Sequence, residues 1–465
     1  MKKRLYLIIE NYNRELESRI YLGLKAANLG WSIVIGNKAN IYKQIKNFQS
    51  GIFFIKSVGP RYVEIIDSIK KYGNRVVATD EENIVFWGSN QLLTRMHPEC
   101  LLELDSYYCW GKREFDYLSS LFGKFKEKFI ITGNPRIDVL KNPLNKKYIN
   151  EANELKKKKG NFILLNSGFG KVVRASKTDW VQDSINAGKL DTEEKIQNEK
   201  QAVKYEADNL DAFVELVNFL TDKLPNQKFI LRTHPAEDDK WFRNIFKSKK
   251  NLEVNTDKIT TNVFITASQC LIAHNCITLL EAYFLNKKCL NFIYKFDKRY
   301  EHELISNCST ILSDKKDILK FINSEIINQH KNFSEDIKKN ITYSIRNSKN
   351  EVNSVDNILK NLDQVYSNVV NKNVLDKNLP KFFFLLKVKS FIYKLYNLYR
   401  IYYTLLIRKD SSMLILHKVS KNKRGTIKTA DINNHLKIYK EILKYKDNFK
   451  VYELYKNVFC IEKSD

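Results

Sequence analysis

Short apolar runs alternate with amphipathic segments through the first 140 residues of the chain. The apolar runs predict strands at residues 5–9, 31–36, 51–55, 75–79, 106–111 and 128–133. The segments between them predict helices, the clearest at residues 14–30, 61–73 and 112–123. Strands that alternate with helices predict a parallel α/β sheet, in which ligands bind at the carboxyl ends of the strands.

A second series of the same kind follows residues 141–160, which are polar and rich in lysine and predict a linker. Strands are expected at residues 161–166, 228–235, 270–275 and 289–294, and helices at residues 206–225 and 276–288. One face of the first helix is apolar, with Phe213, Leu216, Val217 and Leu220. We therefore expect one α/β domain at residues 1–140 and another at residues 161–325, with a cleft between them.

Beyond residue 325 the pattern becomes helical and basic, which predicts a basic helical extension over residues 326–465. In residues 381–409, polar side chains recur every three or four residues and aromatic side chains fill the other faces. Cations on almost every turn disfavour a membrane span, and a helix in the headgroup region of an anionic membrane is the first interpretation. The alternative is a helix that packs on the protein's own core with its lysines in solvent.

The composition adds charge to this picture without identifying a partner. The chain holds 79 Lys and Arg against 53 Asp and Glu, a net charge of +26. Lysine greatly outnumbers arginine, a balance typical of an AT-rich genome, so the charge alone is weak evidence for nucleic acid. Over half of the excess lies in residues 331–465, with 27 basic and 13 acidic residues. We expect no nucleic-acid partner.

The cysteines and the N-terminus indicate the compartment. The seven cysteines form no CxxC pair, which indicates a reducing cytoplasm and no structural metal. The apolar run before Glu10 is too short for a signal peptide, and no uncharged run reaches the length of a transmembrane helix. We expect a cytoplasmic protein that binds the cytoplasmic face of the inner membrane through residues 381–409.

Residues 75–87 contain a β-branched run that ends in three carboxylates, Asp80, Glu81 and Glu82. A carboxylate at the carboxyl end of a strand can take a proton from a hydroxyl, because like charges and partial desolvation raise its pKa. The alternative is a solvated acidic turn that caps the next helix. Glu10 and Arg14 lie beside the end of the first strand, where a solvated helix start is the simpler interpretation.

In the second domain, one strand ends in Arg232 and His234. Pro235 fixes the backbone directly after His234 and so holds the imidazole in place. A histidine that donates a proton beside an arginine suits a phosphate leaving group, which gains charge as it departs. These residue types at a strand end favour a functional site over a structural histidine.

Another candidate segment begins at His274 and runs into a predicted helix. Asn275 and Thr278 lie at its start, where free N–H groups can bind phosphate. Glu281, one turn further along, can accept hydrogen bonds from ribose hydroxyls. The alternative is an ordinary cap on a core helix.

A glycine-bearing loop follows the strand at residues 161–166. Ser167 and Gly168 lie in this loop, which is a flexible candidate for a phosphate cradle, although it matches neither the Walker nor the dinucleotide pattern. The sequence contains no set of His and Cys with metal-ligand spacing. We expect neither a metal nor a cofactor.

Taken together and in order, these segments resemble the bacterial surface-carbohydrate biosynthesis proteins. That family is related to capsule glycosyltransferases that use CMP-activated acidic sugars, such as Kdo transferases and polysialyltransferases. The resemblance covers roughly residues 1–330. It rests on Glu10, Arg14, Glu15, Leu16, Asp80, Glu81, Glu82, Trp110, Gly111, GNPRID at residues 133–138, FILLNSGFG at 162–170, RTHP at 232–235 and NCITLLEA at 275–282.

The resemblance implies a GT-B-like fold, with two Rossmann-type domains facing across a cleft. The N-terminal domain would bind the acceptor, with Glu81 or Glu82 as the base and with Glu10, Arg14 and Asp80 nearby. Asn83 stands where the family pattern has glycine, although asparagine tolerates the same left-handed backbone.

The C-terminal domain would bind the nucleotide sugar. The resemblance implies that His234 binds and protonates the nucleotide phosphate, and that Thr278 and Glu281 lie near phosphate and ribose. Leu279 stands where related helices often have glycine, which puts in doubt how closely the nucleotide approaches the backbone.

We therefore expect inverting, metal-independent transfer of a sugar from a nucleotide donor, a CMP-sugar first. The acceptor would be a glycan or a lipid-linked glycan in capsule or lipopolysaccharide synthesis. The rivals are a glycerophosphotransferase or a sugar epimerase on the same architecture, and a non-catalytic membrane-docked scaffold of polysaccharide assembly. An RNA-binding protein is favoured only by charge.

Overall fold

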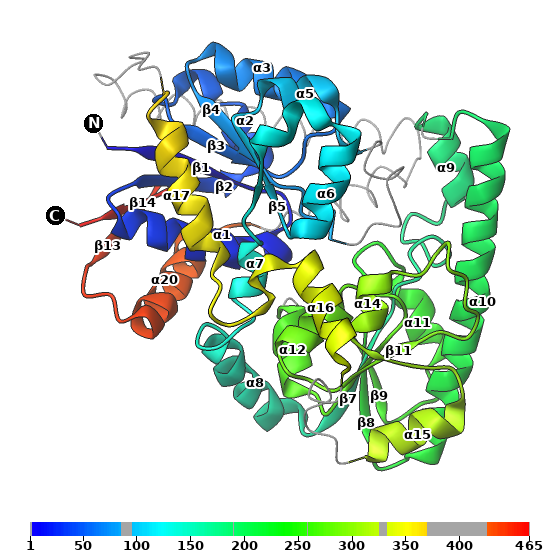
Figure 1. The fold of residues 1–465 in the computed structure, drawn as a ribbon. Helices are drawn as coiled ribbons and strands as arrows, with labels where there is room; N and C mark the ends of the chain where they lie inside the picture. The colour runs from blue at the N-terminus through cyan, green and yellow to red at the C-terminus, as the bar shows by residue number, and fades with distance from the viewer. Residues whose placement is uncertain are drawn as a thin grey trace, which may run out of the picture. The chain divides into compact units, whose positions relative to one another are not determined.

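The computed structural model describes residues 2–84, 95–188, 190–257, 259–324, 333–369 and 426–464. It divides into two compact units (Figure 1). Unit 1 contains the chain up to Leu144 and the described residues from Thr342 onward, and unit 2 contains Asn145–Ile341. The predicted amphipathic helix at residues 381–409 lies outside the described residues.

Unit 1 is built on one large sheet. Its strands are β1 (Arg4–Ile9), β2 (Ser32–Asn37), β3 (Ile52–Ile55), β4 (Arg75–Ala78), β5 (Ser106–Cys109), β6 (Phe129–Ile131), β13 (Phe449–Tyr455) and β14 (Val458–Lys463). Their order is β13-β14-β2-β1-β3-β4-β5-β6. The strands from β2 to β6 are parallel, β14 pairs antiparallel with β2, and β13 pairs antiparallel with β14.

Helices cover both faces of this sheet, because its central strands are apolar on both sides. On one face, α1 (Tyr12–Asn28), α17 (Ser354–Tyr366) and α20 (Thr429–Leu443) pack on Leu5 and Leu7. On the other face, α3 (Val63–Lys71), α5 (Pro98–Glu103) and α6 (Lys112–Leu121) pack on Tyr6 and Ile8. The shorter helical segments are α2 (Lys38–Tyr42), α7 (Pro135–Asp138), η1 (Ile45–Asn47), η2 (Pro60–Tyr62), η3 (Gly123–Lys128) and η5 (Arg346–Ser348), and α16 (Glu335–Ser344) crosses the boundary between the units.

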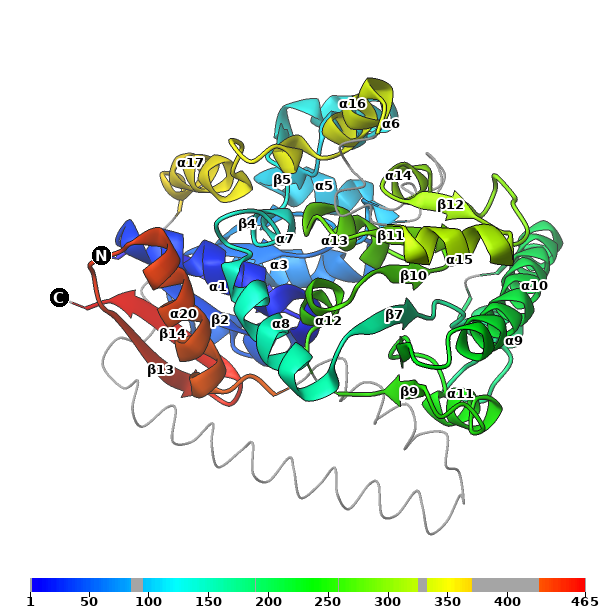
Figure 2. The same cartoon turned by 90° about the horizontal axis from the view of Figure 1, so that it is seen from below.

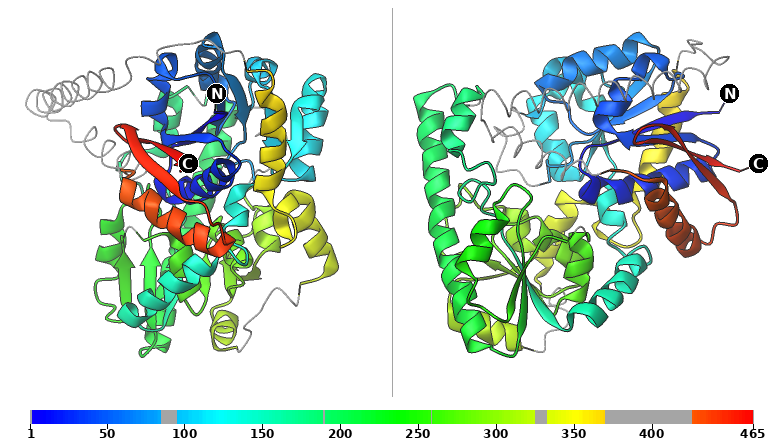
Figure 3. Two further views of the ribbon diagram at one scale, coloured as in Figure 1. Left: turned by 90° about the vertical axis from the view of Figure 1, so that its left-hand side faces the viewer. Right: turned by 180° about the vertical axis from the view of Figure 1, so that it is seen from behind.

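The end of the chain differs from the predicted helical extension. Residues 426–464 form α20, β13 and β14, and the two strands extend the sheet of unit 1 beside β2 (Figure 3). The approach is close, since a Cβ on Gly36 would stand 2.5 Å from the carbonyl oxygen of Asn457. Lysine-rich surroundings obscured the strand pattern, but four consecutive residues of β14, Val458 to Ile461, are buried because both faces of the strand are covered.

Unit 2 is built on a parallel sheet (Figure 2). Its strands are β7 (Phe162–Asn166), β8 (Lys228–Arg232), β9 (Leu252–Asn255), β10 (Leu271–Ala273), β11 (Cys289–Phe292) and β12 (Thr310–Leu312). Their order, β12-β11-β10-β7-β8-β9, is the strand order of a Rossmann fold. The two edge strands β9 and β12 were not predicted, because each is short and contains polar residues.

The core of unit 2 confirms the predicted apolar helix face. Phe213, Leu216, Val217 and Leu220 are fully buried against the sheet on α10 (Glu193–Lys223). The other helices of the unit are α8 (Lys146–Lys159), α9 (Trp180–Asn186), α11 (Asp239–Ile245), α12 (Thr261–Ala267), α13 (Thr278–Phe284), α14 (Glu303–Asn307) and α15 (Lys315–Asn323).

The predicted linker at residues 141–160 is wrong for most of its length. Residues 146–159 form α8, which packs on α12 within unit 2 (Figure 2). Tyr148, Ala152 and Leu155 are buried, and their spacing of four and three residues makes one apolar stripe. The many lysines on the exposed faces concealed this stripe. Within the described ranges, no helix combines the length and apolarity that a membrane span requires.

Candidate functional site

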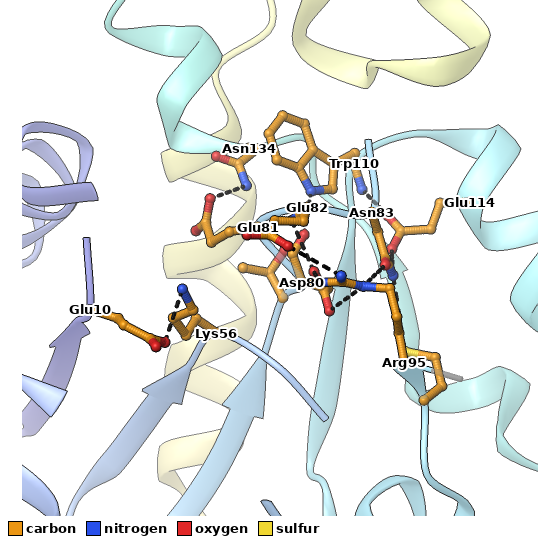
Figure 4. Close-up of polar contacts among 12 residues, drawn as sticks. Glu10, Lys56, Asp80, Glu81, Glu82, Asn83, Arg95, Trp110, Glu114 and Asn134 are labelled. Atoms are coloured by element: carbon orange, nitrogen blue, oxygen red, sulfur yellow. Dashed lines mark hydrogen bonds and ion pairs between the residues drawn. The ribbon is translucent and has the colours of Figure 1, made fainter. Parts of the chain in front are cut away.

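One candidate site lies in unit 1, at the carboxyl ends of β1 and β3. These neighbouring strands mark the point where the strand order of unit 1 reverses, which is where open α/β sheets bind ligands. Glu10 directly follows β1 and Lys56 directly follows β3, and their side chains form an ion pair of 3.1 Å (Figure 4). Burial alone would raise the pKa of Glu10, but Lys56 and Lys38 outweigh it and lower that pKa.

The start of α1 closes this cluster from the side. Glu15 is 1% exposed, pairs with Lys56 at 2.9 Å and accepts the backbone N–H of Glu10 at 2.8 Å. Arg14 extends toward the acidic segment and lies 3.7 Å from a carboxylate oxygen of Glu82. The structure therefore brings together the predicted residues Glu10, Arg14 and Glu82, and it adds Lys56, which the sequence did not single out.

Asp80 is a buried anchor of the acidic segment. It is 1% exposed and accepts hydrogen bonds from Arg95 at 2.6 Å and from the backbone N–H of Glu82 at 2.9 Å. The indole N–H of Trp110 donates to the backbone carbonyl oxygen of Asp80 at 2.8 Å (Figure 4). Burial raises the pKa of Asp80 in spite of the Arg95 guanidinium. These contacts fix the backbone from which the next two carboxylates project.

Glu81 is also buried, and it lies between two arginines. It is 4% exposed, and it lies 3.0 Å from Arg19 and 3.8 Å from Arg136. Arg19 is itself 1% exposed and stacks 4.1 Å from the ring centre of Phe54. Its Nε and Nη1 atoms find no hydrogen-bond partner among the described residues. Glu81 thus neutralises a guanidinium that is buried inside unit 1.

Glu82 is the accessible carboxylate of the three. Its side chain is 53% exposed, and it pairs with Arg95 at 3.2 Å as well as with Arg14. Burial would raise the pKa of Glu82, but Arg95, Arg14 and Lys56 outweigh it and lower that pKa. The pKa of Glu82 is thus lowered and not raised as predicted, and Glu82 is open to a ligand, unlike the buried Asp80 and Glu81.

Asn83, which stands where the family pattern has glycine, is not among the residues with positive φ, so this position does not use the left-handed backbone that asparagine would tolerate. Its side chain is buried and donates to Tyr107 and Glu114, both at 3.0 Å, and accepts from Arg95 at 3.1 Å (Figure 4). An amide that bonds in three directions explains why asparagine stands here in place of glycine. Arg95 and Glu114 could not be located from the sequence, since neither lies near the acidic segment along the chain.

Glu114 makes unit 1 sensitive to pH. Burial raises the pKa of Glu114 from 4.5 to about 7, against the hydrogen bonds from Trp110, Asn83 and Tyr107. The folded state therefore holds this proton up to a higher pH than the unfolded chain. Its stabilising contribution is complete below pH 4.5 and is lost as the pH rises through about 7.

Glu114→Gln removes this titration. We expect the free energy of unfolding of the variant, minus that of wild type, to be larger at pH 8 than at pH 5, because only wild type loses stability over this range. The change between the two values of pH should be on the order of 1–3 kcal/mol. Urea unfolding followed by tryptophan fluorescence measures it. A difference between variant and wild type that is the same at both values of pH would contradict the assignment.

A separate candidate site lies in unit 2, where the strand order reverses between β7 and β10. The loop after β7 and the turn after β10 approach closely, since a Cβ on Gly168 would stand 3.2 Å from the carbonyl oxygen of His274. His274 is buried, bonds through Nδ1 to the carbonyl oxygen of Phe292 and stacks on Phe169. Burial lowers the pKa of His274 to about 4, so this histidine is neutral and structural.

The loop after β7 uses alternate N–H groups to hold its shape. Ser167 N donates to the Arg232 carbonyl oxygen at 3.1 Å, and Lys171 N donates to the Glu206 carboxylate at 2.7 Å. Between them, Phe169 N donates to Glu237. The N–H groups of Gly168 and Gly170 have no partner among the described residues, and both glycines are half-buried rather than buried. The predicted cradle is thus reduced to these two groups.

His234 is exposed, and the turn that carries it defines its tautomer. Its Nδ1 accepts the backbone N–H of Ala236 at 3.2 Å, so the proton of the neutral ring lies on Nε2. Its backbone N–H donates to Glu237 at 2.7 Å. The structure brings together the predicted residues Ser167 and His234, since the backbone N–H of His234 also donates to Ser167 Oγ at 3.3 Å.

Arg232 extends away from this pair toward β9. Its guanidinium donates to the Ile259 carbonyl at 3.1 Å, lies 3.5 Å from Asn255 Oδ1 and stacks 4.3 Å from the ring centre of Phe264. Burial lowers the pKa of Arg232 to about 10. The structure therefore does not join Arg232 to His234 by any contact, although only one residue separates them.

The turn after β10 is held by asparagines at the strand ends. Asn275 has φ of +44°, its N–H donates to Asn291 at 2.8 Å, and its side chain donates to the Tyr300 carbonyl at 2.6 Å. Thr278 accepts from Asn166 at 3.1 Å. Asn275 is thus occupied in shaping the turn and is not aimed at a ligand.

Of the three remaining predicted positions, Thr278 begins α13 at the strand ends, Glu281 is half-buried one turn along, and Leu279 is fully buried in the core. Among the residues that the structure describes, no group of three or more His, Cys, Asp and Glu side chains could hold a metal ion.

No family model matches the sequence, and no curated protein matches it. Among solved structures, the chain is similar to the wall teichoic acid polymerase TagF. A histidine-to-asparagine variant soaked with CDPG shares 12% identity over 78% of this chain and 88% of that chain, with a TM-score of 0.50. A histidine-to-alanine variant shares 13% identity over 79% and 89%, with the same TM-score. The likeness confirms the predicted GT-B-like α/β fold.

Proposed function

We propose that the protein is a transferase of surface-glycan biosynthesis that moves a group from a nucleotide-activated donor to an acceptor hydroxyl. The observation that carries the proposal is the β7–β10 switch point of unit 2. There, the N–H groups of Gly168 and Gly170, the Thr278 hydroxyl and His234 belong to adjoining loops at the strand ends. Backbone N–H groups without side chains beside them suit the oxygens of a phosphate.

Glu82 supplies the base for this reaction. It is the one exposed carboxylate of the acidic segment, and Arg14 and Arg95 keep it ionised. Glu81 is excluded from this role because Arg19 and Arg136 occupy it inside the unit. The burial of Glu81 and the exposure of Glu82 support Glu82 as the base.

For a sugar donor, Glu82 takes the proton of the acceptor hydroxyl while the oxygen attacks the anomeric carbon. The bond from that carbon to the phosphate oxygen breaks, and its electron pair remains on the departing nucleotide. His234 donates Nε2–H to the phosphate as its charge grows. This single displacement inverts the anomeric carbon.

The proposal is tested first by binding. Purified full-length protein is screened by thermal shift against CMP-, UDP- and GDP-sugars, and we expect a CMP-sugar to raise the melting temperature. His234→Ala should lower turnover about 100-fold or more, because a hydrogen-bond donor to the departing phosphate is lost. Arg243→Ala, which removes an exposed side chain of α11, is the control. If no nucleotide stabilises wild type, the transferase proposal fails.

A second candidate is transfer of glycerol phosphate from CDP-glycerol. It is favoured by the likeness to the wall teichoic acid polymerase, whose structure was determined with CDPG. The same Glu82 would activate the acceptor hydroxyl, but the attack would fall on phosphorus and CMP would leave. CDP-glycerol is therefore added to the thermal-shift panel, and stabilisation by it instead of a CMP-sugar selects this candidate.

A further inference from the structure

We propose that Glu237 is the positioning residue of the donor-binding half, a buried carboxylate that sets the glycine loop after β7 and the His234 turn after β8 as one piece. The identity of the ligand that the two loops bind rests on the proposed function. The effect of Glu237 on the two loops is independent of that function.

Three donors converge on this carboxylate. Glu237 is 4% exposed; its Oε1 accepts from Phe169 N at 2.5 Å, and its Oε2 accepts from His234 N at 2.7 Å and from the Ser167 hydroxyl. Two of the donors come from the loop after β7 and the third from the turn after β8. Few side chains can satisfy three donors from two loops, and a carboxyl group is one of them because its two oxygens offer several lone pairs.

Capping of the local turn does not account for the arrangement. A glutamate three residues after His234 can accept that residue's N–H, as in a capping box, and this alone would hold the turn. The bonds from Ser167 and Phe169 arrive from about 70 residues away along the chain. These two bonds are not needed to hold the turn. They connect the glycine loop to it.

The backbone continues the same connection beyond the carboxylate. Arg174 pairs antiparallel with Glu237 in an isolated bridge. Ala175 N donates to the Ala236 carbonyl at 2.9 Å, and Asp238 N donates to the Val173 carbonyl at 3.2 Å. Residues 173–175 and 236–238 therefore form a short antiparallel pairing centred on Glu237, which adds backbone bonds between the two loops.

Glu237 holds in place the loops that carry the candidate phosphate-binding groups. Phe169 N is bonded to Glu237, whereas the N–H groups of Gly168 and Gly170 on either side of it have no partner among the described residues. Loss of the carboxylate would release both the glycine loop and the backbone of His234. The donor would then have to order two loops on binding, which lowers its affinity.

Glu237→Gln is the sharpest variant, because it keeps the shape of the side chain but replaces one acceptor oxygen with an N–H₂ donor. That donor must face either Phe169 N–H or the pair of Ser167 and His234. Ser167→Ala is a milder variant for comparison. It removes the Ser167 hydroxyl bond to Glu237 and leaves the bonds from the backbone N–H groups of Phe169 and His234. Glu215→Gln on the exposed side of α10 is the matched control.

Hydrogen–deuterium exchange of the full chain without ligand tests the coupling directly. In Glu237→Gln we expect exchange of peptides covering residues 167–173 and 232–238 to accelerate together, by about tenfold or more. Ser167→Ala also removes the contacts of that hydroxyl with the Arg232 carbonyl and the His234 N–H, so it should accelerate both peptides by less than Glu237→Gln does, and Glu215→Gln should accelerate neither. Acceleration of one loop alone, or loss of protection throughout β10 and β11, would overturn the proposal.

Binding of CMP separates positioning from stability. We expect Glu237→Gln to raise the dissociation constant for CMP by about tenfold or more while the melting temperature changes little. An unchanged dissociation constant would contradict the role of Glu237 in positioning. If wild type binds no CMP and no CDP-glycerol, the proposed function fails, whereas the exchange experiment still decides whether Glu237 couples the two loops.

Discussion

A chain that stops after residue 369 is expected to lose the folded structure of unit 1. The missing residues include α20, β13 and β14, whose apolar side chains belong to both cores of that unit. The buried members are Ile427, Ile432, Leu436, Tyr439, Val458, Phe459, Cys460 and Ile461. At about 1.5–3 kcal/mol for each large apolar side chain, the loss exceeds about 10 kcal/mol. A typical domain is stable by only about 5–15 kcal/mol.

The matched control is an internal deletion. Residues 371–424 are replaced by a flexible Gly-Ser linker of similar reach, so that residues 426–464 are retained. We expect this variant to keep the circular dichroism and unfolding transition of unit 1, and the truncated chain to lose them. A truncated chain that still unfolds cooperatively in two steps would show that the C-terminal strands are dispensable.

The internal deletion also tests the membrane proposal without disturbing the fold. The variant lacks residues 381–409, and we expect it not to co-sediment with liposomes that contain anionic lipid. The sequence of this segment carries both the positive charges and the aromatic side chains expected to bind such a surface. Neutral liposomes serve as the comparison. Unchanged sedimentation of the variant with anionic liposomes would reject membrane binding by this segment.

The two adjacent glutamates are expected to respond in opposite ways to the same substitution. Glu81→Gln should destabilise unit 1 by about 3–5 kcal/mol, because it leaves Arg19 charged and buried without a counter-ion. Glu82→Gln should change the free energy of unfolding by less than about 0.5 kcal/mol, since the side chain is mostly in solvent. Turnover should instead fall about 100-fold or more, because the base is lost.

Urea unfolding of both variants and turnover with the donor found in the thermal-shift screen measure these effects. Arg19→Met combined with Glu81→Gln is a useful further variant, because it removes both buried charges and should recover part of the stability. Full activity in Glu82→Gln would remove that residue from the mechanism. Equal stability of Glu81→Gln and wild type would show that the Arg19 charge does not depend on it.

Much of the fold could be predicted because the central strands are short apolar runs buried on both faces. The runs at β1, β3 and β7 have almost no polar residues, so they are distinct from the helices around them. The edge strands lack this signal, since one side of an edge is exposed and carries polar groups. For this reason β9 and β12 were missed, and lysine-rich surroundings hid β13 and β14.

The candidate site was predictable only where chemistry follows directly after a strand. Asp80, Glu81, Glu82 and His234 satisfy that condition, and their position was read from the sequence. The different roles of these residues could not be predicted, because the roles depend on partners that are distant in the chain. Arg19 reaches Glu81 from α1, and a pattern along the chain cannot show which of two neighbouring carboxylates such a partner will choose.

The path of the chain also determines the order in which the protein can fold during synthesis. Unit 2 is continuous over residues 145–341 apart from one short segment, so all of its strands leave the ribosome together. The strand β2 must wait for its neighbour β14, which is made more than 400 residues later. Until then β2 is an open edge of a parallel sheet, and Gly36 at that edge has no side chain to protect it. Nascent unit 1 is therefore expected to expose the edge of β2 until β14 has been synthesised.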